Sequence, residues 1–502
     1  MIAPPPVPIL LIAPEVAVLA TAMVVLVADL WLRPERRDLL VGGSVLGVVL
    51  AALLGVTLPD GVGFADRYVR DGLTRVGQTL ALAAIALGIL VAPEYLRRLR
   101  MERGEYYALV LIAGAGAMLM AASGDLLLLF LALETLSIPL YVLAASRRGS
   151  VRSQEAGMKY FLLGTFASAF FLYGIALLYG AAGTTRLAGL ADFLARGPSS
   201  LAAAAGVGLL VIGLGFKAAL VPFHTWAPDV YEGAPFPAAA FMSVVAKIAV
   251  FAALVRVFPL TLGALAGQWT VLLGVLAAVT MIVGNLAALA QTNYKRLLAY
   301  SSIAHAGYLL VGVATATPDA ASAVMTYLAV YAAMGTGAFA VAVALERGGQ
   351  EADRIEDYAG LAERAPLLAA ATALFMISLA GLPPTGGFIA KLGIFAAAVE
   401  GGGRGGLVLA LIGVLTSVTS VYYYLRVPYV MYAGQPGPAV ASGGISSGGI
   451  SSGVGGPGGA VRLHPSPMVN LVLLLTAAVV LQMGFLPRTI IAFAQQVGAL
   501  LR

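Results

Sequence analysis

Residues 236–258 read FPAAAFMSVVAKIAVFAALVRVF, an almost wholly apolar run that carries Lys247 in its middle. A helix needs about 20 mainly apolar residues to cross the hydrocarbon core of a bilayer, and this segment is long enough. The rest of the chain is similar, because 60% of its 502 residues are hydrophobic and only 11% are charged. Soluble domains contain about 25% charged residues, so this composition predicts an all-α polytopic membrane protein.

Further apolar runs of the same kind lie on both sides of this segment. We predict fourteen membrane spans in all, and a short surface helix at 186–197 between the sixth and the seventh. The predicted spans are residues 8–30, 39–58, 75–96, 105–122, 124–145, 156–180, 200–221, 236–258, 270–291, 298–315, 320–345, 366–398, 405–431 and 466–486.

The basic residues of the loops predict the orientation of the chain. Most of them, such as Arg97 and Arg148, lie in the loops that follow odd-numbered spans. Loops rich in lysine and arginine face the cytoplasm, so we expect both termini on the outer side of the membrane. The first apolar run has no basic leader and is interpreted as a retained helix rather than a signal peptide.

Lysines are concentrated where a charge is most costly. Only five of the 30 lysine and arginine residues are lysines, and four fall inside predicted spans: Lys159, Lys217, Lys247 and Lys391. A charge at the centre of a membrane costs at least about 2.5–3.5 kcal/mol. Arginine stays protonated in almost any protein environment, whereas a buried lysine can exchange a proton near neutral pH. These lysines are therefore predicted to move protons.

Simpler roles stay open for some charged residues. Lys159 lies near the end of a span, where its side chain can reach the interface. Lys295, in the segment TNYKR, is interpreted as an ordinary cytoplasmic loop charge. Glu134 lies well inside a span, and a carboxylate at that depth needs a partner, for which a lysine on a neighbouring helix is the natural candidate. Glu15 is expected nearer the interface, with a structural role.

Two spans are predicted to be broken. The seventh continues from Lys217 as KAALVPFHTWAPD, in which Pro222 removes a helical hydrogen bond. The twelfth contains GLPPTGGFIAK from Gly381 to Lys391, which cannot continue as regular helix. Broken helices at membrane depth are tolerated only inside protein or beside a watery cavity, and a corresponding pair indicates an ion site between two repeats.

The breaks suggest an internal repeat. If spans 4–8 and spans 9–13 form two inverted repeats of five helices, the discontinuous helices 7 and 12 correspond. The predicted parts are 1–100 with three spans, 101–260 and 261–432 with one repeat each, 433–465 as a Gly/Ser-rich cytoplasmic linker, and 466–502 with the last span and a tail. The linker is interpreted as a tolerated insertion.

Histidine supplies two further candidates. His224 lies just beyond Pro222, and His305 lies within a span. Histidine titrates near neutral pH and is a plausible proton relay, although a structural role is about as good an interpretation for both residues.

The sequence indicates no redox chemistry or nucleotide hydrolysis on this chain. It has no cysteine, which excludes iron–sulfur clusters and cysteine-based zinc sites. It shows no P-loop and no cluster of haem or metal ligands. The net charge of +6 is spread over short loops, which argues against nucleic acid as a partner.

Four motifs resemble the N-type subunits of bacterial proton-pumping NADH:quinone oxidoreductase (respiratory complex I), members of the antiporter-like, Mrp-related membrane subunits. The segment VPFHTWAPDVYEGAP within the second motif is highly specific. Lys391 stands where M-type sister subunits carry a glutamate. The motifs are KYFLLGTFASAFFLYGIALLYGAAGT at 159–184, GFKAALVPFHTWAPDVYEGAPFPAAAFMSVVAKIAVF at 215–251, GNLAALAQTNYKRLLAYSSIAHAGY at 284–308 and LAGLPPTGGFIAKLGIF at 379–395.

The resemblance implies proton translocation coupled to NADH oxidation and quinone reduction. It implies that Glu134 pairs with Lys217 and that Lys247 connects the path at its centre. Lys391 would face the outward exit, and His224 and His305 would line a water-filled route. FMN, iron–sulfur clusters and quinone would be bound by partner subunits, among them further antiporter-like subunits, in the plasma membrane of a bacterium.

Two other functions fit parts of the pattern. An Mrp-type Na⁺/H⁺ antiporter subunit shares the broader motifs, but one deep carboxylate among several lysines is a poor sodium site because sodium prefers oxygen ligands. A non-pumping structural subunit would use its lysines only to pair with acids. Identification of the partner chains, followed by proton flux in lysine variants, separates the three.

Overall fold

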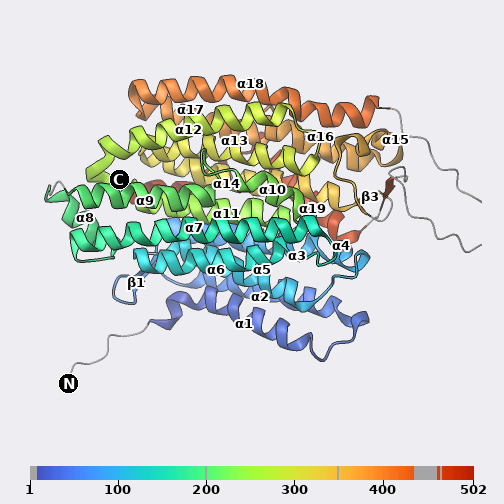
Figure 1. The fold of residues 1–502 in the computed structure, drawn as a ribbon, viewed down its shortest axis with the longest axis horizontal. Helices are drawn as coiled ribbons and strands as arrows, with labels where there is room; N and C mark the ends of the chain where they lie inside the picture. Colours follow the sequence, from blue (N-terminus) through green and yellow to red (C-terminus); the bar gives the residue numbers. More distant parts are fainter. Residues whose placement is uncertain (1–7, 198–199, 348–349, 435–460, 464–465, 502) are drawn as a thin grey trace, which may run out of the picture.

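The computed structural model describes residues 8–197, 200–347, 350–434, 461–463 and 466–501 as a bundle of long helices (Figure 1). Thirteen helices of the described part are long and apolar enough to cross a membrane. The long helices are α1 (Ala13–Ala28), which continues the 3-10 turn Ile9–Ile12 so that the two together span 20 residues, α2 (Asp38–Thr57), α3 (Gly72–Val91), α5 (Gly104–Ala122), α6 (Leu126–Ala144), α7 (Val151–Ala182), α9 (Leu201–Ala218), α11 (Phe236–Val257), α12 (Ala266–Leu289), α13 (Tyr294–Thr315), α14 (Pro318–Val343), α18 (Gly403–Ala433) and α19 (Pro467–Phe485).

Shorter elements join and cover these helices. The short α-helices are α4 (Pro93–Arg98), α8 (Leu187–Ala195), α10 (Trp226–Gly233), α15 (Leu361–Arg364), α16 (Pro366–Ala380), α17 (Gly386–Gly401) and α20 (Arg488–Gly498). The 3-10 turns are Ile9–Ile12, Pro34–Arg36, Gly263–Leu265, Ile355–Tyr358 and Ala499–Leu501. The strands are β1 (Gly61–Gly63), β2 (Tyr68–Arg70), β3 (Leu345–Arg347), β4 (Gln350–Glu351) and β5 (Val461–Leu463).

The predicted spans correspond to the long helices with one difference. The segment 366–398 divides into α16 and α17, of 15 and 16 residues. A helix of that length extends about 24 Å, less than the roughly 30 Å of a bilayer core, so neither half crosses alone. The predicted surface helix at 186–197 contains α8.

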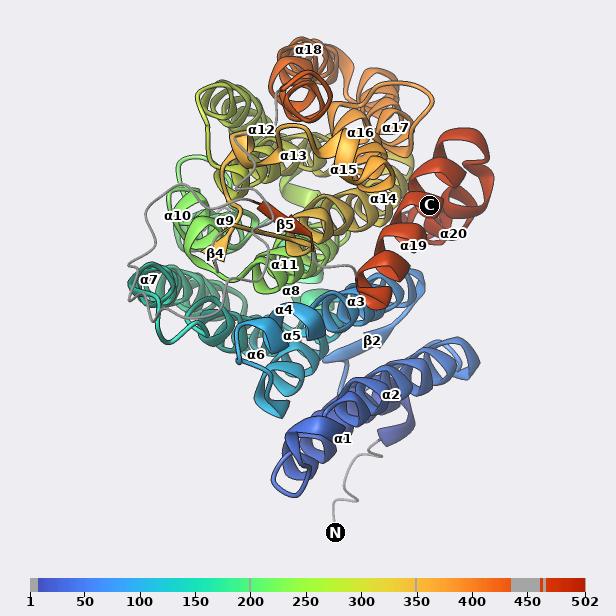
Figure 2. The ribbon, with the colours of Figure 1, turned by 90° about the vertical axis from the view of Figure 1, so that its right-hand side faces the viewer.

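The loops gather at two ends of the bundle. Figure 1 shows α4, α15 and β3 at one end, which we call the basic end because it carries the arginine-rich loops, and α8 and β1 at the other. The first and last described residues lie at the same end of the bundle as α8 (Figure 1). This agrees with a chain that crosses the membrane an even number of times. In the end-on view of Figure 2, α1 and α2 stand at one edge of the bundle and α18 at the opposite edge.

Helix α11 lies at the centre of the bundle. Every one of its 22 residues is buried, and it packs against α3, α5 and α14. A helix that is apolar on all sides is expected inside a large protein or a membrane, and its many alanines allow close approach of its neighbours. Lys247, near the middle of α11, is therefore enclosed by protein rather than by lipid.

The two broken helices end with the same cap. The cap residues Ala219 after α9 and Gly381 after α16 adopt the left-handed conformation, with φ of 59° and 81°. In both, the following leucine donates its N–H to the carbonyl five residues earlier, at 2.8 Å for Leu220 and 3.1 Å for Leu382. This is a Schellman motif. The shared cap agrees with the predicted correspondence of the two helices, while the inverted repeats themselves stay a prediction.

Several elements were not predicted. β1 and β2 form an antiparallel hairpin, and β4, β3 and β5 form a small antiparallel sheet in that order. The tail after the last span contains α20, which packs against α14 and α3. Most of the predicted linker, residues 435–460, lies outside the described residues.

Candidate functional site

Lys217 lies in the last turn of α9, just before the first break, and only 3% of it is exposed. Its Nζ donates hydrogen bonds to Ser137 Oγ at 2.8 Å and to Tyr160 OH at 3.1 Å. It also lies 5.6 Å from the ring centre of Tyr141. The amine is thus enclosed by α6 and α7 and is held by neutral hydroxyl groups.

Glu134 precedes Ser137 by one turn on α6, but it forms no direct ion pair with Lys217. Its Oε1 accepts a hydrogen bond from Ser168 Oγ on α7. Among the described residues, the ion pairs do not include one between this carboxylate and the amine of Lys217, which is bonded to Ser137 instead. The direct pair implied by the resemblance is therefore absent from this conformation, although both groups lie against the same stretch of α6.

Lys247 is the second buried amine, with 3% of the residue exposed. Its Nζ lies 5.7 Å from the ring centre of Tyr331 on α14, and no hydrogen bond or ion pair holds it within the described part of the chain. The ring of Tyr331 lies 5.2 Å from the ring of His305. Tyr331 therefore stands between the lysine and the histidine.

His305, on α13, is only 1% exposed and uses both ring nitrogens. Nδ1 lies 2.6 Å from Tyr327 OH, and Nε2 lies 3.1 Å from Tyr424 OH. In a neutral imidazole one ring nitrogen donates and the other accepts. The two hydroxyls therefore fix a ring that can receive a proton on one nitrogen and release one from the other.

Lys391 lies on α17 beyond the second break, and 5% of it is exposed. Its Nζ donates to the carbonyl of Ala380, the last residue of α16, at 2.9 Å. It also lies 4.7 Å from the ring centre of Tyr308, whose ring is 5.7 Å from that of His305. The structure therefore forms a chain of contacts, which we call the central row: Lys247, Tyr331, His305, Tyr308 and Lys391.

Gly381 makes room for Lys391. A Cβ atom at this position would lie 2.7 Å from Lys391 Cδ and 3.2 Å from its Nζ, and the positive φ of 81° strains any side chain. We expect Gly381→Ala to lower the free energy of unfolding by about 1–3 kcal/mol and to push the amine away from Ala380. Thermal unfolding of the purified chain in detergent measures the effect.

The control for this substitution is Gly208→Ala in α9, where a Cβ would have no atom within 4 Å. Alanine is favoured over glycine in a helix by about 1 kcal/mol, so this variant should unfold at the same or a higher temperature. Equal melting temperatures for the two variants would contradict the tight packing of Lys391 against Gly381.

A line of aromatic side chains leads from the first lysine toward the central row. The ring of Tyr160 stacks on Trp226 at 4.4 Å, and the ring of Tyr231 follows at 6.4 Å. The hydroxyl of Tyr231 lies 3.4 Å from Ser302 Oγ, one turn before His305 on α13. Because an indole cannot relay a proton, transfer along this line requires water beside the rings.

His224 is not joined to the central row. It lies in the break between α9 and α10, and its Nδ1 is buried without a hydrogen-bond partner. No hydrogen bond, ion pair or ring contact in the described structure connects its ring to a lysine. Its role as a relay stays a prediction.

Lys159 belongs to a charge cluster at the basic end. With 42% of its side chain exposed, its Nζ lies 2.8 Å from Asp229 Oδ2 and 2.7 Å from Glu155 Oε1. Arg296 also donates to Asp229, and a polar cavity of about 190 Å³ opens beside these groups. The exposure of Lys159 fits the interfacial interpretation. The cluster also places charge next to Tyr160 on α7.

The prediction of Lys295 as a loop charge is wrong. Asn293 caps α13 at this point, so the residue lies in a helix, where it is 1% exposed and contacts Glu351 Oε2 at 2.7 Å. Burial alone would raise the pKa of Glu351, but Lys295, and more weakly Arg147, hold it below its ordinary value. Glu351 also accepts the backbone N–H of Phe236, so the pair ties the starts of α11 and α13 to β4.

Sequence comparison identifies the family. Residues 123–420 match the family described as NADH:quinone oxidoreductase/Mrp antiporter, TM. NADH-quinone oxidoreductase subunit N of Trichlorobacter lovleyi is 43% identical over 492 residues, which cover 97% of this chain and 96% of that protein. The chain belongs to the NADH-quinone oxidoreductase subunit N family.

Other relatives and solved structures agree with the subunit N family. Subunit N 1 of Herpetosiphon aurantiacus is 45% identical over 85% of this chain and 88% of its own length. A chain of respiratory complex I from Thermus thermophilus superposes with a TM-score of 0.77 at 36% identity, over 95% of this chain and 98% of that one. A chain of the Mrp complex from Dietzia sp. has a TM-score of 0.79 at 24% identity, over 97% and 96% of the two chains, and shares the fold.

Proposed function

We propose that this chain is a membrane-arm subunit of NADH:quinone oxidoreductase that carries protons across the membrane on buried side chains. The observation that carries the proposal is the central row, in a chain of the subunit N family. Its amines and imidazole are at most 5% exposed, and they are groups that can exchange a proton, whereas a guanidinium cannot.

The path begins at the basic end, which we assign to the cytoplasm. Protons reach Lys217 from the polar cavity around Lys159, because the neighbouring residue Tyr160 bonds the amine of Lys217. Water beside the aromatic line carries them to α13 and the central row. Lys391 is the last amine, and it touches a carbonyl freed by the second break, where a helix end at membrane depth needs a polar surrounding.

Glu134 controls the first step in this proposal. Serine hydroxyls now hold its carboxylate and the amine of Lys217 apart. A small rearrangement of α6 against α7 that brings the two together favours the protonated amine, and their separation favours proton release. The pair thus loads and unloads the lysine without any redox group on this chain.

The free energy of a pKa change at a buried amine is comparable to the cost of moving one proton across the membrane. Moving one proton against 100 mV costs about 2.3 kcal/mol. A change of two units in the pKa of a buried amine is worth about 2.7 kcal/mol, so one such change per cycle suffices. The free energy comes from quinone reduction in partner subunits, which hold FMN, the iron–sulfur clusters and quinone in the plasma membrane of the bacterium.

The test begins with the partners of the chain. A complex isolated in mild detergent through a tag on this chain should contain flavin and iron–sulfur subunits, and membrane vesicles should take up protons when NADH is added. An assembly of antiporter-like chains without redox subunits would instead indicate an Mrp-type antiporter.

Lys247→Met then separates a pump from a scaffold. Proton transfer by a positioned group contributes about 10²–10⁴-fold to a rate, so NADH-driven uptake through this chain should be almost lost. Arg196→Met, at the exposed end of α8, is the control and should pump normally. Normal pumping by an assembled Lys247→Met complex would leave the chain a structural role.

A further inference from the structure

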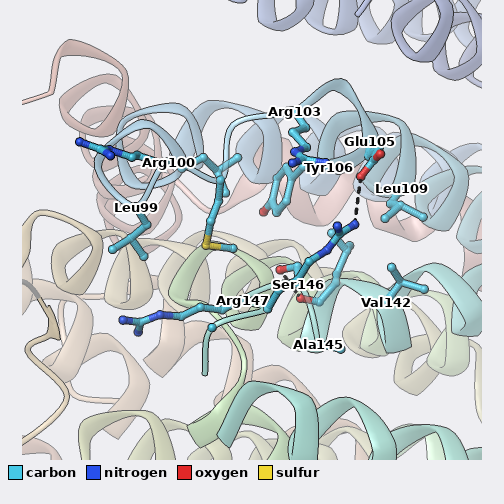
Figure 3. Close-up of a pocket in the computed structure, with 15 residues that line it drawn as sticks. Leu99, Arg100, Arg103, Glu105, Tyr106, Leu109, Val142, Ala145, Ser146 and Arg147 are labelled. Atoms are coloured by element: carbon cyan, nitrogen blue, oxygen red, sulfur yellow. Dashed lines mark hydrogen bonds and ion pairs between the residues drawn. The ribbon is translucent and has the colours of Figure 1, made fainter. Parts of the chain in front are cut away.

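A cavity of about 470 Å³ opens at the basic end, away from the lysines of the proposed proton path. It lies where α5 begins at Gly104 and α6 ends at Ala144, so it is at the level where lipid headgroups meet the bundle. Figure 3 shows the side chains around it, which come from the turn after α4, from the first turns of α5 and from the end of α6 with the loop that follows.

The wall of this cavity is strongly basic. Four arginines line it, and the single lining carboxylate is that of Glu105. Arg148 lies 3.8 Å from Glu105, with 78% and 53% of the two side chains exposed, so this contact is weak. Arg147 also lies 3.9 Å from Glu351, whose charge Lys295 already balances. The excess positive charge therefore fits an anion.

A buried hydroxyl in the same wall lacks a partner. Tyr106 is 5% exposed, and its hydroxyl oxygen makes no hydrogen bond. Figure 3 shows its ring beside Arg103 in the wall of the cavity. A buried polar group without a hydrogen bond is costly, and a hydroxyl is satisfied by an oxygen acceptor placed among these side chains.

The remaining wall is apolar and continues onto the outer surface of α6. Leu109 and Val142 line the cavity. Further exposed apolar side chains continue this surface along α6. Together with Val142, which is 48% exposed, they form an outward stripe of Leu127, Leu131 and Ile138, which are 45%, 60% and 57% exposed. Residues at this spacing share one helix face. An occupant with an anionic head and long apolar chains would match both parts.

We propose that this cavity binds the headgroup of an anionic phospholipid. Arginines bind phosphate oxygens through paired charge-assisted hydrogen bonds, and basic pockets at the cytoplasmic ends of membrane helices recognise acidic headgroups. The phosphate lies among Arg103, Arg148 and the hydroxyl of Tyr106, while the acyl chains lie along the stripe on α6. The residues that line the headgroup cavity are not part of the proposed proton path.

The full chain, stripped of lipid in non-ionic detergent, is titrated with dioctanoyl phosphatidylglycerol and analysed by native mass spectrometry. Arg103→Gln with Arg148→Gln should weaken binding at least about tenfold, since two charged contacts are lost. Tyr106→Phe should weaken it by about three- to tenfold. The same substitution should not lower the melting temperature without added lipid, because it breaks no hydrogen bond and removes an unpartnered buried hydroxyl.

Two further arms identify the ligand. Dioctanoyl phosphatidylcholine should bind far more weakly than phosphatidylglycerol, and inorganic phosphate should not displace the lipid. Arg36→Gln, an exposed arginine of the same end that does not line the cavity, is the matched control and should bind normally. Equal loss in this control, unchanged binding in the Tyr106 and arginine variants, or displacement by free phosphate would each overturn the proposal.

Discussion

Replacing Lys217 with methionine should abolish most of the NADH-driven proton uptake that passes through this chain. Lys217 is 3% exposed, and its amine donates hydrogen bonds to both Ser137 and Tyr160. Methionine has a similar length but no exchangeable proton. Because a positioned proton-transfer group contributes about 10²–10⁴-fold to a rate, the flux through this path should fall by at least about a hundredfold.

The same substitution should not weaken the fold. A buried charge costs free energy, so its replacement by an apolar side chain of similar volume is neutral or stabilising in many proteins. Assembly and NADH oxidation with an added artificial electron acceptor should therefore persist. The measurement is the quenching of a pH-sensitive dye in inverted vesicles, compared with the rate of NADH oxidation in the same sample.

Lys217→Arg distinguishes charge from proton exchange. Arginine keeps the positive charge near Ser137 but does not release its proton, so uptake should fall as in the methionine variant. Restored uptake with arginine would mean that the lysine acts only as a fixed charge. Normal uptake in the assembled methionine variant would remove Lys217 from the path altogether.

The features that the sequence predicts well are those that depend on local composition. Long apolar runs predict the helices, since each must fill the thickness of a bilayer by itself. Proline and glycine clusters predict the breaks after Ala218 and Ala380, because both residues act on the backbone at their own position. The lysines are conspicuous because a charge within an apolar run is rare.

The partners of these lysines could not be predicted in the same way. Tyr160, Tyr331 and Tyr424 lie on α7, α14 and α18, and a tyrosine within a membrane helix is an ordinary residue in the sequence. Only packing shows that one bonds Lys217 and two contact His305. The direct pair between Glu134 and Lys217 was likewise expected from a resemblance, but in this conformation each of the two groups is hydrogen-bonded to a serine instead.

Depth is the property that sequence assigns least well near helix ends. Lys295 follows the polar residues TN and looks like part of a loop, but the segment that carries Glu351 folds over it and buries it. Arg256 is similar. It lies near the end of the predicted span 236–258, where an arginine is expected to reach the interface, yet only 6% of it is exposed.

Among single substitutions of residues near the helix ends, Arg256→Leu should therefore cause the largest loss of stability. Its guanidinium binds both carboxylate oxygens of Asp71 at 2.9 Å and also donates to Ala121 O and Thr74 Oγ1. These contacts fasten the start of α3 to the end of α11. Removing one member of a buried pair costs about 3–5 kcal/mol because the other charge is left unpaired.

The loss of stability in Arg256→Leu is expected to depend on pH. Burial alone would raise the pKa of Asp71, but Arg256 outweighs it and holds this pKa below its ordinary value. The pair therefore stabilises the fold above about pH 4, the pKa of a free aspartate, and this contribution is lost as the pH falls through the lower folded-state pKa. In Arg256→Leu the Asp71 carboxyl is no longer held ionised. The loss in free energy of unfolding relative to the parent protein should therefore be largest near neutral pH and should shrink in acid.

The matched control is Arg75→Leu, which removes an ion pair with Asp60 at 3.1 Å in which 37% and 45% of the side chains are exposed. Such surface pairs are worth about 0–1 kcal/mol, so this variant should melt close to the parent. A double variant, Arg256→Leu with Asp71→Asn, should recover part of the loss, since no unpaired charge remains. Equal melting temperatures for Arg256→Leu and Arg75→Leu would show that α3 and α11 are held together by their apolar contacts alone.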